Sequence, residues 1–331
     1  MKLSRLGEFG LIERIRRSTV TGRGVRIGIG DDCAWVKLTS GSALITADLL
    51  IEHVHFDLNW TSLFDLGHKS LAVNLSDIAA MGGVPAYVIL SLGIPANFDT
   101  RDIDEFYRGF NRLAHKHGVA LVGGDTNVAD FFIISVCVIG HPTARPIRRS
   151  GAQVGDDIYV TGTLGDSALG FALLRNKKLP GIGSRVISQL VARHHRPAPR
   201  LGAGALLARL KIATAMIDIS DGLLQDLGHI CQASNVGAVI WNEKLPLSSA
   251  YRTLSGKAGS DYALNGGEDY ELLFCARRHH RQRLDKLRGR GRTKFTRIGR
   301  CVGAEQGVNV LNGSGKPIEM KFTGHDHFKK Q

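Results

Sequence analysis

The sequence predicts an α/β protein with mixed sheets, because strand-like and helix-like segments alternate along nearly all of its 331 residues. Short apolar runs indicate strands, and longer runs with apolar residues at every third or fourth position indicate helices. Acidic residues recur where strand-like runs give way to turns. Such turns commonly carry ligand-binding residues, so we expect a binding site at the strand ends.

The first half contains clearly patterned elements. Residues 8–17 have one apolar stripe and predict a helix, followed by a glycine-rich loop at 22–30. Two short strands come next, at 33–36 and 43–47, and the second is expected to end at Asp48. Further helices are expected at 61–81 and 101–117, and further strands at 84–94, 120–122 and 131–140. The near-continuous apolar character of 84–94 is typical of a strand covered on both faces. The strand at 120–122 is expected to stop at Gly123-Gly124-Asp125.

The segment 141–157 contains prolines, glycines and arginines and predicts a linker between two domains. We place an N-terminal domain at 1–145 and a C-terminal domain at 146–331. The alternation continues in the second half, with strands expected at 158–162, 214–218, 236–241 and 270–274, helices at 165–174, 184–194, 201–210 and 220–233, and two short strands after a basic stretch.

The composition predicts a cytoplasmic protein with no membrane partner. Hydrophobic residues make up 43% of the chain and charged residues 22%, an ordinary globular balance. No apolar run approaches the ~20 residues that a membrane span needs, and the N-terminus lacks a signal-like apolar core. The five cysteines are far apart without a CxxC spacing, which indicates reduced core residues.

The formal net charge of +13 raises the possibility of nucleic-acid binding, since a basic face attracts phosphate backbones. Residues 277–300 hold eleven Lys and Arg side chains against one acid, Asp285. Phe295 is the sole aromatic residue there, and residues 281–287 have the spacing of a solvated helix face. We therefore favour a solvated surface and expect no nucleic-acid partner, with nucleic-acid binding as the alternative.

Asp77 lies among apolar residues near the end of the helix predicted at 61–81, which the pair Gly82-Gly83 is expected to terminate. A carboxylate in such surroundings is costly unless a partner compensates its charge. It either makes a local cap or a single salt bridge, or it shares a cation with other carboxylates.

Five further acidic clusters favour the shared cation. Mg²⁺ is held by carboxylate oxygens, with substrate phosphates and waters completing its shell. The chain has no Walker loop, His-Glu-x-x-His or protein-kinase signature, so a nucleotide would be held through metals and scattered basic groups. Arg149 is the best-placed basic candidate and Lys69 the second, although each could be a surface charge. The clusters are Gly30-Asp31-Asp32, Ala47-Asp48, Gly124-Asp125, residues 217–221, and Gly267-Glu268-Asp269.

Six stretches in order along the chain, at 28–34, 71–82, 123–126, 159–162, 217–223 and 266–272, resemble the thiamine-monophosphate kinase family. The ending at 324–328 extends the resemblance. Aminoimidazole ribonucleotide synthetase, selenophosphate synthetase and a hydrogenase-maturation protein belong to the same superfamily. An ATP-dependent synthetase acting on another anion is therefore the alternative, but the 266–272 stretch and the C-terminal ending favour the thiamine family.

The resemblance implies transfer of the γ-phosphoryl group of ATP to thiamine monophosphate, the last step of thiamine diphosphate biosynthesis, assisted by several Mg²⁺ ions. The acceptor is already an oxyanion, so neither a protein nucleophile nor a general base is expected. The implied fold is an N-terminal domain whose strands form a β-barrel across a homodimer, with a C-terminal α/β domain packed beside it.

The resemblance also assigns roles residue by residue. Asp77 would be shared by more than one ion, and Asp77 and Asp125 would act in catalysis by positioning metal. Ala47 occupies a metal position without the hydroxyl group that relatives often carry, and Phe322 stands where they often carry Trp. The other implied metal ligands are Asp32, Thr46, Asp48, Asp218 and Asp221; the implied ATP contacts are Tyr107, Gly124, Asp125, Arg149 and Ser220; the implied substrate contacts are His55, Glu268 and Phe322.

Overall fold

The structure is a computed structural model that describes residues 13, 25–39, 41–175, 184–254, 259–288 and 293–318. The helix predicted at 8–17 lies outside the described residues except for position 13. Phe322 and the ending at 324–328 lie outside them entirely.

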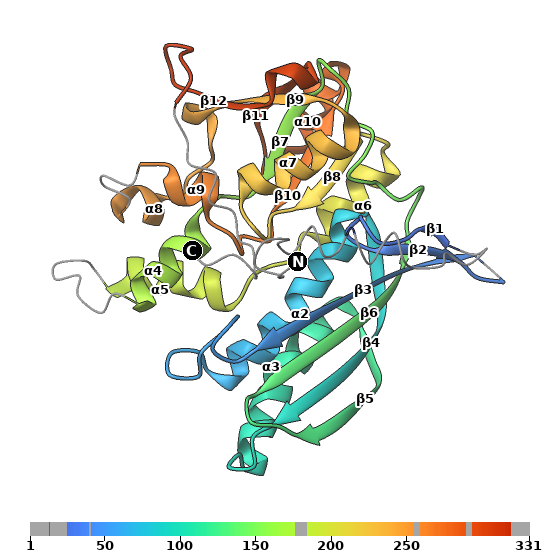
Figure 1. The fold of residues 1–331 in the computed structure, drawn as a ribbon, viewed down its shortest axis with the longest axis vertical. Helices are drawn as coiled ribbons and strands as arrows, with labels where there is room; N and C mark the ends of the chain where they lie inside the picture. The colour runs from blue at the N-terminus through green and yellow to red at the C-terminus, as the bar shows by residue number, and fades with distance from the viewer. Residues whose placement is uncertain are drawn as a thin grey trace.

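The described strands form two six-stranded mixed sheets, one in each half of the chain (Figure 1). The strand order is β1-β2-β3-β6-β4-β5 in the first sheet and β12-β9-β11-β7-β10-β8 in the second. The mixed α/β prediction is confirmed, and neither described sheet closes into a barrel within this chain. The strands are β1 (Val25–Ile27), β2 (Ala34–Lys37), β3 (Ser42–Ile51), β4 (Gly83–Ile94), β5 (Ala120–Val128), β6 (Ile133–Pro142), β7 (Asp157–Thr161), β8 (Ala213–Asp218), β9 (Gly237–Trp241), β10 (Leu272–Ala276), β11 (Phe295–Val302) and β12 (Val308–Leu311).

Two strands run further than the sequence predicts. β3 continues past Asp48, because its pairing with β6 persists from Leu44 to Ile51 and keeps the backbone extended. β5 does not stop at Gly123 but continues through Asp125, in parallel register with β4. β5 is an exposed edge strand, so its residues need not be apolar to stay in the sheet.

The helices follow the predicted positions closely, and α2 and α3 begin at side-chain caps. The Ser62 hydroxyl caps α2 by accepting the Asp65 backbone N–H, and Asp99 forms a capping box at the start of α3. No described helix has both the length and the apolar character needed to cross a membrane. The helices are α2 (Leu63–Ala80), α3 (Thr100–His117), α4 (Asp166–Arg175), α5 (Ser184–His195), α6 (Leu201–Arg209), α7 (Leu223–Ser234), α8 (Ser249–Leu254), α9 (Asp261–Asn265) and α10 (Arg281–Arg288); α8 and α9 were not predicted.

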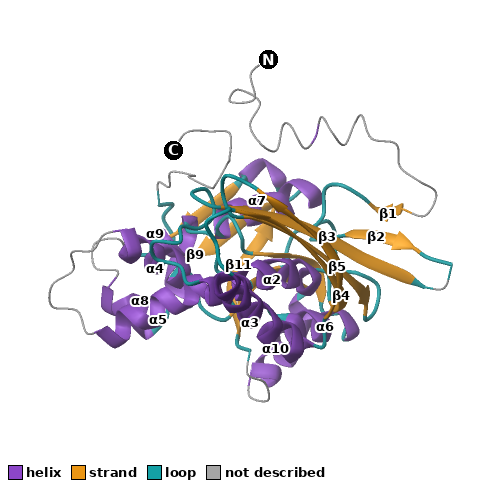
Figure 2. Ribbon diagram, turned by 90° about the horizontal axis from the view of Figure 1, so that it is seen from below, coloured by secondary structure: helices purple, strands orange, loops and turns teal. Residues whose placement is uncertain are grey.

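Helices α2 and α3 cover one face of the first sheet (Figure 2), whereas side chains on its other face are exposed among the described residues. Along β4, Leu90 and Leu92 are buried, whereas Tyr87 is 52% exposed and Ile89 38% exposed. The prediction that this strand is covered on both faces is therefore wrong for the part of the chain that the structure describes. A strand with apolar residues on both faces has one face that nothing in the described chain covers.

The basic stretch folds largely as predicted. It forms α10 and part of β11, and residues 282, 283, 285 and 286 are exposed, as expected for a solvated helix face. Leu284 and Phe295 are buried on the core side, and Asp157 is paired with two of the arginines. The five cysteines are free thiols, and all except the half-buried Cys137 are buried, in agreement with the prediction.

Helix α2 is also the contact between the two halves. Ala79 and Ala80 belong to a core cluster that includes residues of α6 and of the second sheet. A Cβ atom at Gly204 of α6 would lie 2.0 Å from the Ala79 carbonyl oxygen, so only glycine permits this close crossing. The second half is thus packed directly against the end of α2 that carries Asp77.

We predict that Gly204→Ala destabilises the fold by about 1–3 kcal/mol, because the added methyl group must push α6 away from α2. Gly202→Ala in the same helix is the matched control, since its Cβ would meet no atom within 4 Å. The control should be stabilised by up to about 1 kcal/mol through helix propensity. Denaturant unfolding measures both changes, and equal stability of the two variants would contradict the close crossing.

Candidate functional site

Three carboxylates meet at the junction of the two halves. Asp32 precedes β2, Asp77 lies on α2 and Asp218 ends β8, and each contributes an oxygen within 4.8 Å of those of the other two. Burial and the neighbouring carboxylates raise the pKa of Asp218 to about 7 and that of Asp77 well above its ordinary value. Three like charges this close require a compensating cation if all are to be ionised.

Asp32 provides the test of whether a metal fits here. Its side chain is buried, and its Oδ1 accepts a hydrogen bond of 2.9 Å from Arg149 Nη2. Its Oδ2 is buried without a hydrogen-bond partner among the described residues. An unpartnered carboxylate oxygen in an all-oxygen donor set suits a hard divalent cation such as Mg²⁺.

Strand β3 brings further oxygen ligands to the same place. Thr46 Oγ1 donates a 2.6 Å hydrogen bond to Asp77 Oδ2, and the Asp48 backbone N–H donates to Asn74 Oδ1 at 3.2 Å. Burial, together with the charge of Asp221, raises the pKa of Asp48 to about 6. Ala47 is exposed on β3, and its methyl side chain has no ligand atom. Its backbone carbonyl oxygen is therefore the only group that it can offer a metal.

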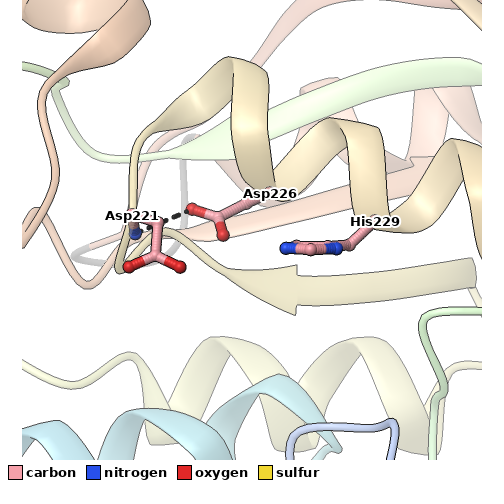
Figure 3. A group of neighbouring side chains, drawn as sticks. All are labelled: Asp221, Asp226 and His229. Carbon is pink, nitrogen blue, oxygen red and sulfur yellow. Dashed lines mark hydrogen bonds between the residues drawn. The ribbon is translucent and has the colours of Figure 1, made fainter. Parts of the chain in front are cut away.

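The loop after β8 carries Ser220 and Asp221 and is shaped by Asp226 of α7 (Figure 3). The buried Asp226 carboxylate accepts the backbone N–H groups of Asp221, at 3.2 Å, and of Gly222, at 3.1 Å. Asp221, Asp226 and His229 also place ligand atoms within 4.8 Å of one another. Because Asp226 already receives two backbone donors, its evident role is to organise the loop.

A second loop, at 266–270, lies directly against this one. The Glu268 N–H donates to the Ser220 carbonyl oxygen at 2.7 Å, and the Tyr270 N–H donates to the Ile219 carbonyl oxygen at 2.9 Å. A Cβ at Gly267 would lie 2.4 Å from the Ser220 oxygen, which explains the need for glycine there. The two acidic loops therefore form one backbone unit.

Glu268 is held by two side chains, Lys69 of α2 and His194 of α5. Lys69 Nζ lies 2.8 Å from Glu268 Oε1, and His194 Nδ1 lies 3.0 Å from Oε2. Burial raises the pKa of the Glu268 carboxyl group, but the charges and hydrogen bonds of Lys69 and His194 lower it by more. The net pKa therefore lies well below its usual range. Glu268 and Tyr270 both have positive φ, a strain of about 1–3 kcal/mol each that is common at functional sites.

Several residues assigned by resemblance lie apart from the acid cluster. Gly124 and Asp125 are exposed on edge strand β5, and the strand order puts β5 about 14 Å from β3 across the sheet. Tyr107 packs edge-on against the rings of Phe106 and Phe110 in α3. His55 lies in the turn after β3, where its Nδ1 accepts the backbone N–H of residue 51.

Two contributors to the site, Asp226 and His194, were not predicted from the sequence, and Lys69 was predicted only as a basic candidate for a nucleotide or as a surface charge. Lys69 is 1% exposed and paired with Glu268, so it is not a surface charge. Asp226 could have been found, because an acid in the first helical turn after Asp-Gly commonly caps the preceding N–H groups. His194 gave no local signal, because α5 meets Glu268 only in the folded chain.

The comparisons with known proteins agree with this geometry. The AIR synthase related protein N-terminal domain matches residues 30–141, and the corresponding C-terminal domain matches residues 153–311. Thiamine-monophosphate kinase of Escherichia coli (strain K12) is 40% identical over 329 residues, which cover 97% of this chain and 98% of that protein. The chain belongs to the thiamine-monophosphate kinase family.

Solved structures of this family have the same fold. AaThiL complexed with AMPPCP and TMP is 36% identical, covers 99% of both chains and superimposes with a TM-score of 0.83. Thiamine-monophosphate kinase from Stenotrophomonas maltophilia K279a is 41% identical, with a TM-score of 0.78 over 94% of this chain and 98% of that one. Family membership thus extends over the whole architecture and both acidic loops.

Proposed function

We propose that this protein phosphorylates thiamine monophosphate with ATP and releases thiamine diphosphate and ADP. The observation that carries the proposal is the trio Asp32, Asp77 and Asp218 in a chain related over nearly its full length to thiamine-monophosphate kinases. One buried oxygen of this trio has no hydrogen-bond donor in the part of the chain that the structure describes. A relative of the same fold has been solved with an ATP analogue and TMP. The reaction joins two polyanions, and a cation site of this kind meets their main requirement.

Mg²⁺ is the cation that these oxygen ligands favour, and several ions are expected. Asp32, Asp77 and Asp218 would hold one ion, and Thr46, Asp48 and Asp221 would supply oxygen ligands to it or to further ions. When bound, Mg²⁺ neutralises charge on the phosphates and holds their oxygens in line. Arg149, paired with Asp32, adds a cation beside the acid cluster. The loop that carries Ser220 is hydrogen-bonded to the backbone of Glu268 and so connects the acid cluster with Glu268.

The chain needs no protein nucleophile for this reaction. The acceptor phosphate carries its own oxyanion, so the protein contributes position and electrostatic compensation. Glu268, His55 and Phe322 are proposed to contact the thiamine end.

We place the reaction in the cytoplasm. We place the domain boundary between residues 145 and 146, in the segment between β6 and β7.

We also propose a homodimer in which a second copy covers the open face of the first sheet and extends the strands into a barrel. Two observations support it: Tyr87, Ile89, Leu121 and Val122 are exposed apolar residues of β4 and β5, and β5 is a long uncovered edge strand. Gly124 and Asp125 lie on β5, so the assembly would bring them into an enclosed position.

The dimer can be tested with Val122→Asp, which places a charge on an exposed apolar position of β5. Sedimentation should give a dimer for the unsubstituted protein and a monomer for this variant. Val154→Asp is the matched control, because Val154 is similarly exposed, at 66%, but lies outside both sheets. A monomeric unsubstituted protein, or dissociation by both substitutions alike, would contradict the proposed interface.

The activity is tested by incubating the protein with ATP, Mg²⁺ and thiamine monophosphate and separating the products by chromatography. Thiamine diphosphate should form, and Asp77→Asn should reduce turnover by at least about a hundredfold, a loss typical of removing an electrostatic stabiliser. The same variant should keep or gain thermal stability without metal, because removing one carboxylate relieves the repulsion that raises the pKa of Asp77.

Absence of thiamine diphosphate above the Asp77→Asn background would refute the proposed function. ATP turnover that responds to an aminoimidazole ribonucleotide precursor and ignores thiamine monophosphate would instead favour the synthetase alternative.

A further inference from the structure

A buried ion pair lies on α2 about two helical turns before Asp77. Lys69 is 1% exposed, and its Nζ lies 2.8 Å from Glu268 Oε1. Lysine is rarely so deeply buried unless its charge is paired, and Glu268 is the acid that pairs with it. Glu268 itself keeps 31% of its side chain exposed, so it remains accessible to a ligand.

The second carboxylate oxygen of Glu268 is fixed as well. His194 Nδ1 lies 3.0 Å from Oε2, and the imidazole ring is stacked on Phe171 with 5.1 Å between ring centroids. One partner on each oxygen restricts rotation of the carboxylate. The side chain is therefore oriented before any ligand arrives.

The backbone beneath Glu268 is equally constrained. Its φ of 63° is unusual for a residue with a side chain, and its N–H is bonded to the Ser220 carbonyl oxygen. Buried ion pairs contribute little net stability, whereas strained backbone persists mainly where geometry matters for function. The contacts around Glu268 therefore indicate preorganisation for a ligand more than a contribution to folding.

We propose that Lys69 is a positioning residue for the thiamine end of the acceptor, holding the Glu268 carboxylate at a set distance from the acid cluster around Asp77. This inference rests on the proposed function. Lys69 and Asp77 lie on the same rigid helix, separated by about 12 Å along its axis. The cationic thiazolium ring and the aminopyrimidine N–H groups of thiamine both complement a fixed carboxylate.

The experiment is steady-state kinetics of Lys69→Met, which keeps an unbranched side chain one atom shorter and removes its charge. The KM for thiamine monophosphate should rise about tenfold or more, because Glu268 is no longer oriented, while the KM for ATP and kcat change less than about threefold. His194→Phe should shift the same constant in the same direction by a smaller factor. It keeps an aromatic ring on Phe171, so it provides the test independently if Lys69→Met folds poorly.

A double-mutant cycle separates positioning from general damage. Once Glu268→Gln has removed the carboxylate charge, adding Lys69→Met should leave the KM for thiamine monophosphate within about twofold of that of Glu268→Gln alone. Arg281→Met is the matched control, because it also removes a cation paired with a buried carboxylate, Asp157, but between α10 and β7, where no proposed site residue lies. It should leave both KM values unchanged.

The outcomes distinguish this inference from the proposed function. If the unsubstituted protein makes no thiamine diphosphate, the proposed function fails and the inference falls with it. If the protein is active, three results would overturn the positioning role alone. Lys69→Met and His194→Phe could leave the KM for thiamine monophosphate unchanged, or they could raise the KM for ATP by the same factor. The effect of Lys69→Met on the KM for thiamine monophosphate could also add in full to that of Glu268→Gln.

Discussion

Electrostatic repulsion among Asp32, Asp77 and Asp218 is the constraint on which the rest of the structure depends. The three carboxylates come from three separate elements and meet within 4.8 Å, where burial and mutual repulsion raise the pKa values of Asp77 and Asp218. Folding brings these groups together at a cost that only a cation or protonation can offset. A fold that maintains such a cluster is organised for a ligand that supplies positive charge.

Helix α2 makes this arrangement possible because its position is determined by packing on all sides. It covers the first sheet, contacts α3 along its length and meets α6 through the close approach at Gly204. Asp77, near the C-terminal end of the helix, and Lys69, two turns before it, therefore occupy fixed positions. The loops at 218–222 and 266–270 are hydrogen-bonded to each other, so the acid cluster and Glu268 belong to one rigid frame.

Much of this arrangement could be predicted from the sequence. Helical periodicity located α2 and α3 to within two residues, because both depend on local pattern and capping. The acid clusters were recognised because glycine followed by an acid recurs at turns. The extent of β3 and β5 could not be predicted, since both strands continue through polar residues only because a neighbouring strand pairs with them. Contacts such as that of Lys69 with Glu268 join segments about two hundred residues apart and have no local signature.

The most direct test of the central claim is to crystallise the protein with Mn²⁺ in place of Mg²⁺ and a non-hydrolysable ATP analogue, and to measure anomalous scattering at the manganese edge. An anomalous peak is expected within coordination distance of carboxylate oxygens from Asp32, Asp77 and Asp218, and no peak is expected there in Asp77→Asn. A bound nucleotide with no manganese at these three carboxylates would contradict it.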